Sequence, residues 1–204
     1  MREHAAIAPL REPAFLRIWS ASVLSNFGQM ILGVGVAWEM TRLTSVPGMV
    51  ALVQTAMMLP LMLVALPAGA IADTFDRKRV AILGLCISAF FGSILSALAF
   101  VELTSPWLLL GFCFLIGTGV ALYSPAWQSS IGEQVTPEVL PAAIGLNTIS
   151  YNVARSFGPA IGGLIVLAAG AQAAFAFNAV SYLPLILAFL LWKRIHLPSR
   201  LPPE

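Results

Sequence analysis

The chain has 204 residues, of which 59% are hydrophobic and only 10% are charged. Soluble domains carry about a quarter charged residues, so this composition excludes a water-soluble globular protein and makes lipid the main solvent. The formal net charge of +2 is small, and no basic face exists outside short loops, which argues against a nucleic-acid partner.

Apolar runs long enough to cross a bilayer as a helix, about 20 residues each, recur along the chain. Six segments qualify, at residues 18–40, 49–72, 80–101, 107–131, 142–169 and 173–192. Their connections are short, and none resembles a soluble domain or a flexible linker. We therefore predict an all-α, polytopic membrane protein whose six transmembrane helices form one bundle over residues 18–192.

Lys and Arg are distributed unevenly over the connections between these spans. With six spans, nine of the eleven basic residues lie on one side, Arg42 alone lies on the other, and Arg155 lies within a span. Because Lys and Arg accumulate on the cytoplasmic side, we predict both termini in the cytoplasm and the bundle in the inner (plasma) membrane. Residues 1–17 then form a cytoplasmic segment, and residues 193–204 begin a cytoplasmic central loop or form a tail.

Residue types that perform covalent or metal chemistry are not grouped within the predicted spans. His4 and His196 lie in the flanking segments, and Cys86 and Cys113 fall in apolar runs without metal-ligand spacing. An intramembrane enzyme needs a nucleophile and base, or a ligand set, at depth. We therefore predict a non-enzyme without metal or cofactor, in which both cysteines are structural thiols.

Polar residues form stripes at helical spacing in the first and fourth spans. The stripes include Ser22, Asn26 and Gln29 in the first span, and Ser124 and Gln128 in the fourth. Polar residues on one face of a membrane helix either bond to neighbouring helices or line a wet cavity. The repetition of the pattern in spans one and four indicates two three-helix repeats, a known transporter design.

The fifth span contains the one charge at depth, Arg155, on a stripe that begins with Asn147 and Tyr151 and continues to Gly158 and Gly162. A charged side chain at mid-bilayer is costly, so it should face protein or water and have anionic or carbonyl partners. Two interpretations remain open at this point. Arg155 either belongs to a transport pathway or gate, or bonds carbonyl groups of neighbouring helices and locks the bundle.

The same span continues with Gly158-Pro159-Ala160-Ile161-Gly162-Gly163. Gly158 and Gly162 are four residues apart and predict a face that allows close helix approach. Pro159 lacks an amide donor, which predicts a kink at this position.

The densest group of charges lies between the second and third spans, where residues 69–79 hold five of the chain's twenty charged residues. This stretch resembles the loop signature between helices two and three of the major facilitator superfamily. The residues that carry the match are Gly69, Asp73, Asp76, Arg77, Lys78 and Arg79.

Further stretches are similar to the same superfamily. Residues 155–163, with Arg155, Gly158, Pro159, Gly162 and Gly163, resemble the helix-five motif of antiporter-type exporters. Residues 42–44 and 124–126 resemble the branch that contains the enterobactin exporter and the transmembrane secretion effectors. The resemblance covers roughly residues 10–195.

This resemblance implies a fold, a function and partners. The fold is one half bundle, the amino-terminal one of two, built from two three-helix inverted repeats. The function is secondary-active efflux of a small molecule by alternating access, in a cavity between two such halves. The implied partners are the lipid bilayer, a small-molecule substrate and a second six-helix half, which is the chain's own carboxy-terminal half, a second copy or a partner chain.

The resemblance also implies roles for particular residues. Asp73 and Arg77 would belong to a charge network at the cytoplasmic gate, and helix five would help to seal and hinge the bundle. Helices one and four would line the cavity. The candidate lining residues are Ser22, Asn26, Gln29, Ser124, Gln128, Asn147 and Tyr151.

An alternative from another class remains open. The length of six helices and the unpartnered Arg155 also fit a non-transporting membrane scaffold, or a truncated half transporter that binds another membrane protein.

Overall fold

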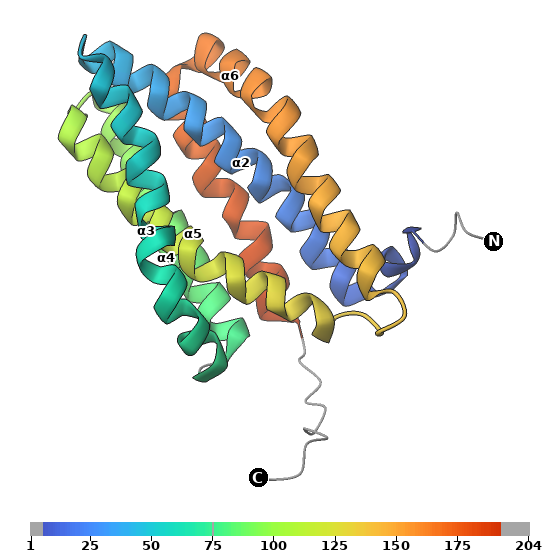
Figure 1. Cartoon of the computed structure of the whole chain (residues 1–204). Helices are drawn as coiled ribbons and strands as arrows, with labels where there is room; N and C mark the ends of the chain where they lie inside the picture. The colour runs from blue at the N-terminus through green and yellow to red at the C-terminus, as the bar shows by residue number, and fades with distance from the viewer. Residues whose placement is uncertain (1–5, 75, 193–204) are drawn as a thin grey trace.

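The computed structural model describes residues 6–74 and 76–192, with the side chains at 65–74 left undescribed. The described chain is helical and consists of two short 3-10 turns and five α-helices (Figure 1). The elements are η1 (Ala8–Arg11), α2 (Pro13–Leu43), α3 (Pro47–Thr74), α4 (Arg77–Phe100), α5 (Pro106–Ser130), η2 (Ile131–Glu133) and α6 (Leu140–Leu191).

Helix starts follow from local residue chemistry. Proline begins α2, α3 and α5, because its fixed φ suits the first turn and its missing N–H would be unpaired there. The Asp76 carboxylate caps α4 by accepting from the Lys78 and Arg79 amides at 2.9 and 3.2 Å. These signals extend two helices beyond the apolar runs, so α2 and α4 begin five and three residues before the predicted spans.

The α6 element contains a chain reversal at Gly170, whose φ of 79° and ψ of 172° are non-helical. Only glycine adopts this region readily. Figure 1 shows the orange part before this residue and the red part after it running in opposite directions. By length and composition, five helices within the described residues can cross a membrane, with α6 counted once. The reversal falls inside the predicted connection between the fifth and sixth spans.

Helix packing depends on small residues at the crossings. A Cβ atom built on Gly84 of α4 would lie 2.5 Å from the Gly119 carbonyl oxygen of α5. A Cβ atom on Gly117 of α5 would lie 2.6 Å from the Met57 carbonyl oxygen of α3. Backbones approach this closely only where neither helix has a side chain in the way.

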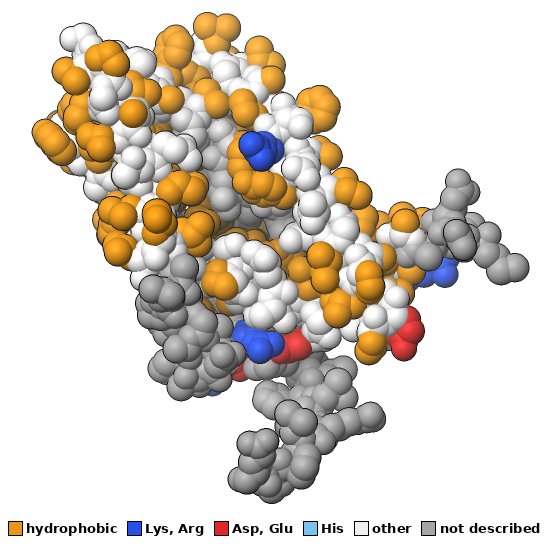
Figure 2. All heavy atoms as spheres, viewed as in Figure 1, with side chains coloured by type: hydrophobic (Ala, Val, Ile, Leu, Met, Phe, Trp, Pro, Cys, Tyr) orange, Lys and Arg blue, Asp and Glu red, His pale blue; other side chains and the backbone are white. Residues whose placement is uncertain are grey.

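Apolar side chains are packed inside the bundle and also cover its outside. The two larger of three buried clusters lie around Phe15, Tyr182 and Phe189 and around Leu32, Leu109 and Phe175. Large apolar residues nevertheless stay exposed, including Phe100 at 76% and Leu167 at 79%, and hydrophobic colour covers much of the surface in Figure 2. A surface of this kind is suited to lipid.

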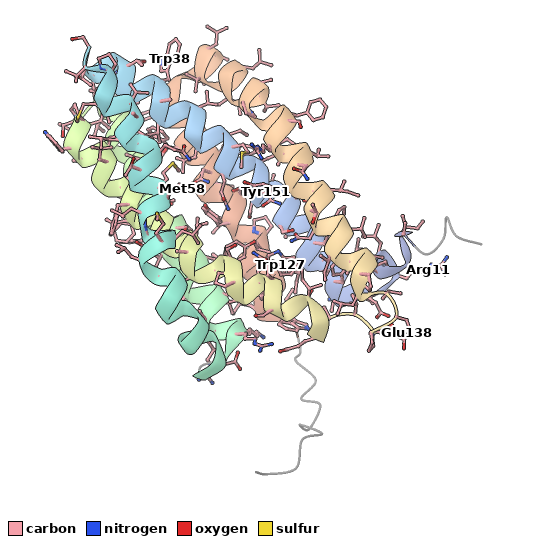
Figure 3. The ribbon with its side chains drawn as sticks, in the orientation of Figure 1. Arg11, Trp38, Met58, Trp127, Glu138 and Tyr151 are labelled. Atoms are coloured by element: carbon pink, nitrogen blue, oxygen red, sulfur yellow. The ribbon has the colours of Figure 1, made fainter. Side chains whose placement is uncertain are left out.

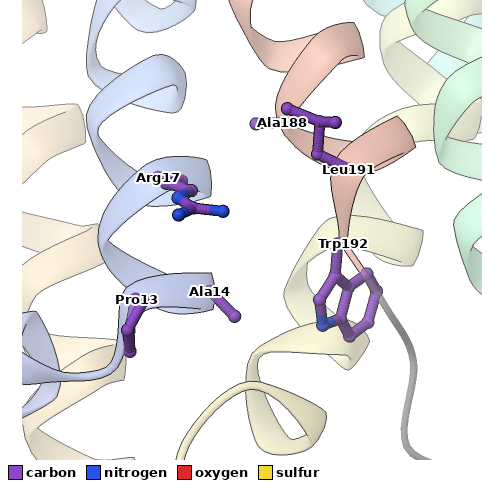
Figure 4. Close-up of a pocket in the computed structure, with 6 residues that line it drawn as sticks. All are labelled: Pro13, Ala14, Arg17, Ala188, Leu191 and Trp192. Carbon is purple, nitrogen blue, oxygen red and sulfur yellow. The ribbon is translucent and has the colours of Figure 1, made fainter.

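The start of α2 and the end of α6 lie at the same end of the bundle. Arg17 and Trp192 both line a cavity between these two helix ends, together with Pro13 and Leu191 (Figure 4). The Lys78 ammonium at the start of α4 donates to the Leu190 and Trp192 carbonyl oxygens at 3.1 and 2.7 Å. We call this end of the bundle the basic end.

Candidate functional site

One face of the bundle is hollowed. Two neighbouring cavities of about 460 and 410 Å³ share Gln29, Met58, Val120 and Tyr151, and together we call them the groove. Four helices contribute to it. Its lining includes Asn26, Gln29 and Met30 of α2, Gln54, Met57 and Met58 of α3, Gly117, Ser124, Trp127 and Gln128 of α5, and Asn147, Tyr151 and Arg155 of α6.

Figure 3 labels three side chains around this hollow: Met58 of α3, Trp127 of α5 and Tyr151 of α6. Figure 2 shows the hollowed face with basic colour beside the hollow and acidic colour only in the lower part of the view. The groove is therefore framed by helices far apart in sequence.

Six of the seven candidate lining residues lie in the groove. Some of them bond to neighbouring helices as well. The Asn26 amide donates to the Ser150 hydroxyl at 3.2 Å, which joins α2 to α6. The Trp127 indole donates to the Asn147 amide oxygen at 3.3 Å, which joins α5 to α6. Both interpretations of the polar stripes thus hold together, because these groups line the groove and also tie its walls.

Ser22 lies outside the groove, unlike Asn26 and Gln29 of the same polar stripe. It is 1% exposed, and its hydroxyl donates to the Trp19 carbonyl oxygen at 2.8 Å within α2. It is not among the residues that line the groove. Ser22 lies one turn before Asn26 in α2, and the lining of the groove on this helix begins only at Asn26.

Arg155 lines the larger cavity and is exposed. The expected carbonyl or anionic partner is not found: within the described residues, its guanidinium has no hydrogen bond or ion pair. No described Asp or Glu lines either cavity. The interpretation in which Arg155 locks the bundle through neighbouring carbonyls therefore has no support among these contacts.

The glycines of the helix-five motif differ in their surroundings. A Cβ atom on Gly158 would lie 2.5 Å from the Met30 Cβ, and one on Gly162 would lie 3.1 Å from the Ile31 Cα. Both residues therefore pack directly on α2, whereas Gly163 has nothing within 4 Å.

Pro159 lies in the same helix, and the backbone there keeps helical dihedral angles. The non-helical angles within α6 occur at Gly170 instead. The kink expected at Pro159 therefore stays a prediction, since the one non-helical residue recorded within α6 is Gly170.

The basic loop motif falls partly on described residues. The Arg77 guanidinium contacts the Glu133 carboxylate and the Ser129 carbonyl oxygen, both at 3.4 Å. Arg79 is exposed. The side chains of Gly69 and Asp73 lie outside the described residues, and so does the expected contact between Asp73 and Arg77. The loop residues that are described link the start of α4 to the ends of α5 and α6.

Sequence reasoning missed the contribution of α3 to the groove. Gln54, Met57 and Met58 line the larger cavity. Gln54 is an amide inside an apolar run, the same signal that identified Gln29, and could have been found in that way. The two methionines carry no such signal, because apolar residues are expected on every face of a membrane helix.

A second missed cluster lies at the end opposite the basic end. The Glu39 carboxylate is 4% exposed and accepts from the Thr104 hydroxyl at 2.6 Å. The Arg42 guanidinium donates to the same carboxylate at 2.8 and 3.0 Å. This cluster joins the end of α2 to the connection between α4 and α5.

Comparison with known proteins agrees with this architecture. A family model described as transmembrane secretion effector, of the major facilitator superfamily, matches residues 4–204. No solved structure matches the chain.

Several curated proteins are similar to the chain. The staphyloferrin A transporter of Staphylococcus aureus is 26% identical over 91% of this chain and 46% of its own length. Macrolide efflux protein A of Streptococcus pyogenes is 24% identical over 74% of this chain and 37% of its own length. The multidrug efflux pump Tap of Mycobacterium tuberculosis is 28% identical over 78% of this chain and 39% of its own length.

The chain thus spans less than half the length of these relatives. The family match extends over nearly the whole chain, and the apolar helices agree with a multi-pass membrane protein. The chain belongs to the transmembrane secretion effector family of the major facilitator superfamily.

Proposed function

We propose that the chain supplies the amino-terminal half of a secondary-active efflux transporter that moves a small molecule by alternating access. The observation that carries the proposal is the groove, whose polar side chains come from four helices of an otherwise apolar bundle. Relatives named as a transporter and as efflux pumps support the direction of transport. The chain performs no covalent chemistry in this proposal.

The groove needs a second wall. Its amides and Arg155 cannot face acyl chains without a large cost, so water and protein must cover them. A second six-helix unit would enclose the groove and form a substrate cavity between two halves. This unit is the chain's own carboxy-terminal half, a second copy or a partner chain.

Six spans in two repeats agree with the arrangement of the helices. In this proposal the two parts of α6 on either side of Gly170 are the fifth and sixth spans. The first triplet then begins with α2 and the second with α5. Both of these first helices line the groove, as expected for three-helix repeats related by inverted symmetry.

We infer that the basic end is cytoplasmic, in the inner (plasma) membrane, with both termini on that side. There Arg77 and Lys78 connect α4 to α5 and α6. A rigid cytoplasmic end of this kind would move as one body when the two halves rock. Gly69 and Asp73 would complete the gate on the preceding helix.

Cysteine labelling of the intact protein tests this function. In a background with Cys86→Ala and Cys113→Ala, Ser124→Cys in the groove should react with a membrane-impermeant maleimide. Leu167→Cys, at a position that is 79% exposed on the apolar surface, should not react. Arg79→Cys should react only when the reagent reaches the cytoplasmic side.

Transport is measured separately as uptake into inverted vesicles, with a macrolide or staphyloferrin A supplied in the medium, which faces the cytoplasmic side of the protein. Flux that collapses with a proton uncoupler, and is lost in Asp73→Asn, agrees with the proposal. A groove position that no reagent reaches from either side would contradict it and favour a scaffold whose groove is sealed by another membrane protein.

A further inference from the structure

Arg155 occupies an unusual electrostatic position within the groove. It lies fifteen residues from Leu140 and fifteen from Gly170, about 22 Å of helix from either end of this run. A guanidinium is charged at every physiological pH. At this depth the guanidinium cannot reach the membrane surface. Its positive charge must therefore be compensated inside the groove.

The described part of the chain provides no anionic or carbonyl partner for the Arg155 guanidinium. No carboxylate or carbonyl bonds the guanidinium, and no described acidic residue lines either cavity. A single cation in a cleft with apolar walls attracts anions strongly, because low-dielectric walls focus its field. Because Arg155 is unpaired among the described residues, its anion is expected to come from outside that part of the structure.

The residues around Arg155 are suited to an organic molecule. The Gln29, Gln54 and Tyr151 side chains line the same cavity and have no hydrogen bond within the described structure. They offer neutral donors and acceptors beside the guanidinium.

Met30, Met57 and Met58 line the same cavity beside these polar groups. Thioether side chains are flexible and polarizable, and they adapt to apolar surfaces of different shapes. The cavity thus combines one fixed cation with an adjustable apolar wall.

We propose that Arg155 is the recognition residue for an anionic group of the transported molecule, and that the substrates are amphipathic organic anions. The anionic group accepts from the guanidinium, and the apolar body lies on the methionine wall. This inference rests on the transport function proposed above. The same guanidinium would otherwise pair with an acidic residue of the second half, and the experiment separates these two sources of the anion.

Three probes with the same ring and different charge provide the test. They are naphthalene-1-acetate, the neutral naphthalene-1-acetamide and the cationic 2-(1-naphthyl)ethylamine. Binding to the intact protein in nanodiscs is measured by equilibrium dialysis. Wild-type protein, Arg155→Gln, Arg155→Lys and Arg11→Gln are compared, since Arg11 is an exposed arginine outside the groove.

We expect wild-type protein to bind the acetate in preference to the amide and the amine. Arg155→Gln should weaken acetate binding about 10- to 100-fold, the effect of losing one hydrogen bond to a charged group. Amide binding should change less than about twofold. Arg155→Lys should restore part of the preference because it keeps the charge, and Arg11→Gln should match wild type.

Several results would overturn the inference. The proposed anion site is contradicted if naphthalene-1-acetate binds wild-type protein and Arg155→Gln with equal affinity. It is also contradicted if the acetate binds neither protein. A preference for the amine contradicts it as well. If all three probes weaken equally in Arg155→Gln, the guanidinium pairs with an acidic residue of the second half instead of the substrate.

Transport of the same probes in proteoliposomes distinguishes this inference from the function on which it rests. Flux without any charge preference contradicts the anion site and leaves the transporter in place. Arg155-dependent acetate binding without flux of any probe supports the site and contradicts transport.

Discussion

Gly158 of α6 and Met30 of α2 lie so close that a Cβ atom on the glycine would be 2.5 Å from the Met30 Cβ. Met30 also lines the groove. The contact between α2 and α6 therefore joins the parts of the groove wall that hold Met30 and Arg155, and the glycine allows the two helices to approach closely.

Gly158→Ala should destabilise the bundle because the added methyl group meets a Cβ atom that cannot rotate away. Overpacking of this kind costs about 1–3 kcal/mol. The thermal unfolding midpoint in detergent, followed by size exclusion, measures the effect. Gly163→Ala is the matched control, since nothing lies within 4 Å of it. Equal midpoints for the two variants would contradict the close packing.

Gly170→Ala should destabilise the reversal inside α6. The φ of 79° at this residue is unfavourable for a residue with a Cβ atom, at a cost of about 1–3 kcal/mol. The midpoint should therefore fall. Gly111→Ala, a helical glycine with open space around it, should leave the midpoint unchanged or raise it. A Gly170→Ala variant as stable as wild type would mean that the chain does not turn here.

Thr104→Val should weaken the contact between α2 and the connection that follows α4. The Thr104 hydroxyl donates to the buried Glu39 carboxylate at 2.6 Å, and hydrogen bonds to charged groups contribute about 1.5–3 kcal/mol. Thr41→Val is the control, because the exposed Thr41 hydroxyl bonds only within its own helix. A double-mutant cycle with Glu39→Gln should show coupling between the two positions. Additive effects would argue against the bond.

Asp76→Ala should loosen the first turn of α4. The Asp76 carboxylate accepts from the Lys78 and Arg79 amides, and loss of such a cap costs about 0.5–2 kcal/mol. Hydrogen exchange at these two amides should become faster in Asp76→Ala. Asp76→Asn keeps a side-chain acceptor and should retain most of the protection. Equal exchange in the alanine variant and wild type would rule out the cap.

The length of the apolar runs and the positions of proline and glycine at helix boundaries determined where the helices lie. Apolar stretches of bilayer length, Pro13 and Pro106 at helix starts, and Gly170 at the reversal are all local signals, and the structure places helices or breaks at each. Local chemistry decides these features, because helix formation and termination depend on neighbouring residues.

Polar stripes in the sequence identified six residues of the groove, and the tertiary structure alone decided the rest of its lining. Ser22 turned inward although its stripe points to the groove, and the methionines of α3 entered the groove without any polar signal. In a membrane, lipid is as apolar as the protein interior, so hydrophobicity does not tell an inner face from an outer one. Likewise, the sequence places Arg155 at depth, but only the packing of four helices around it leaves its charge without a partner in the described chain.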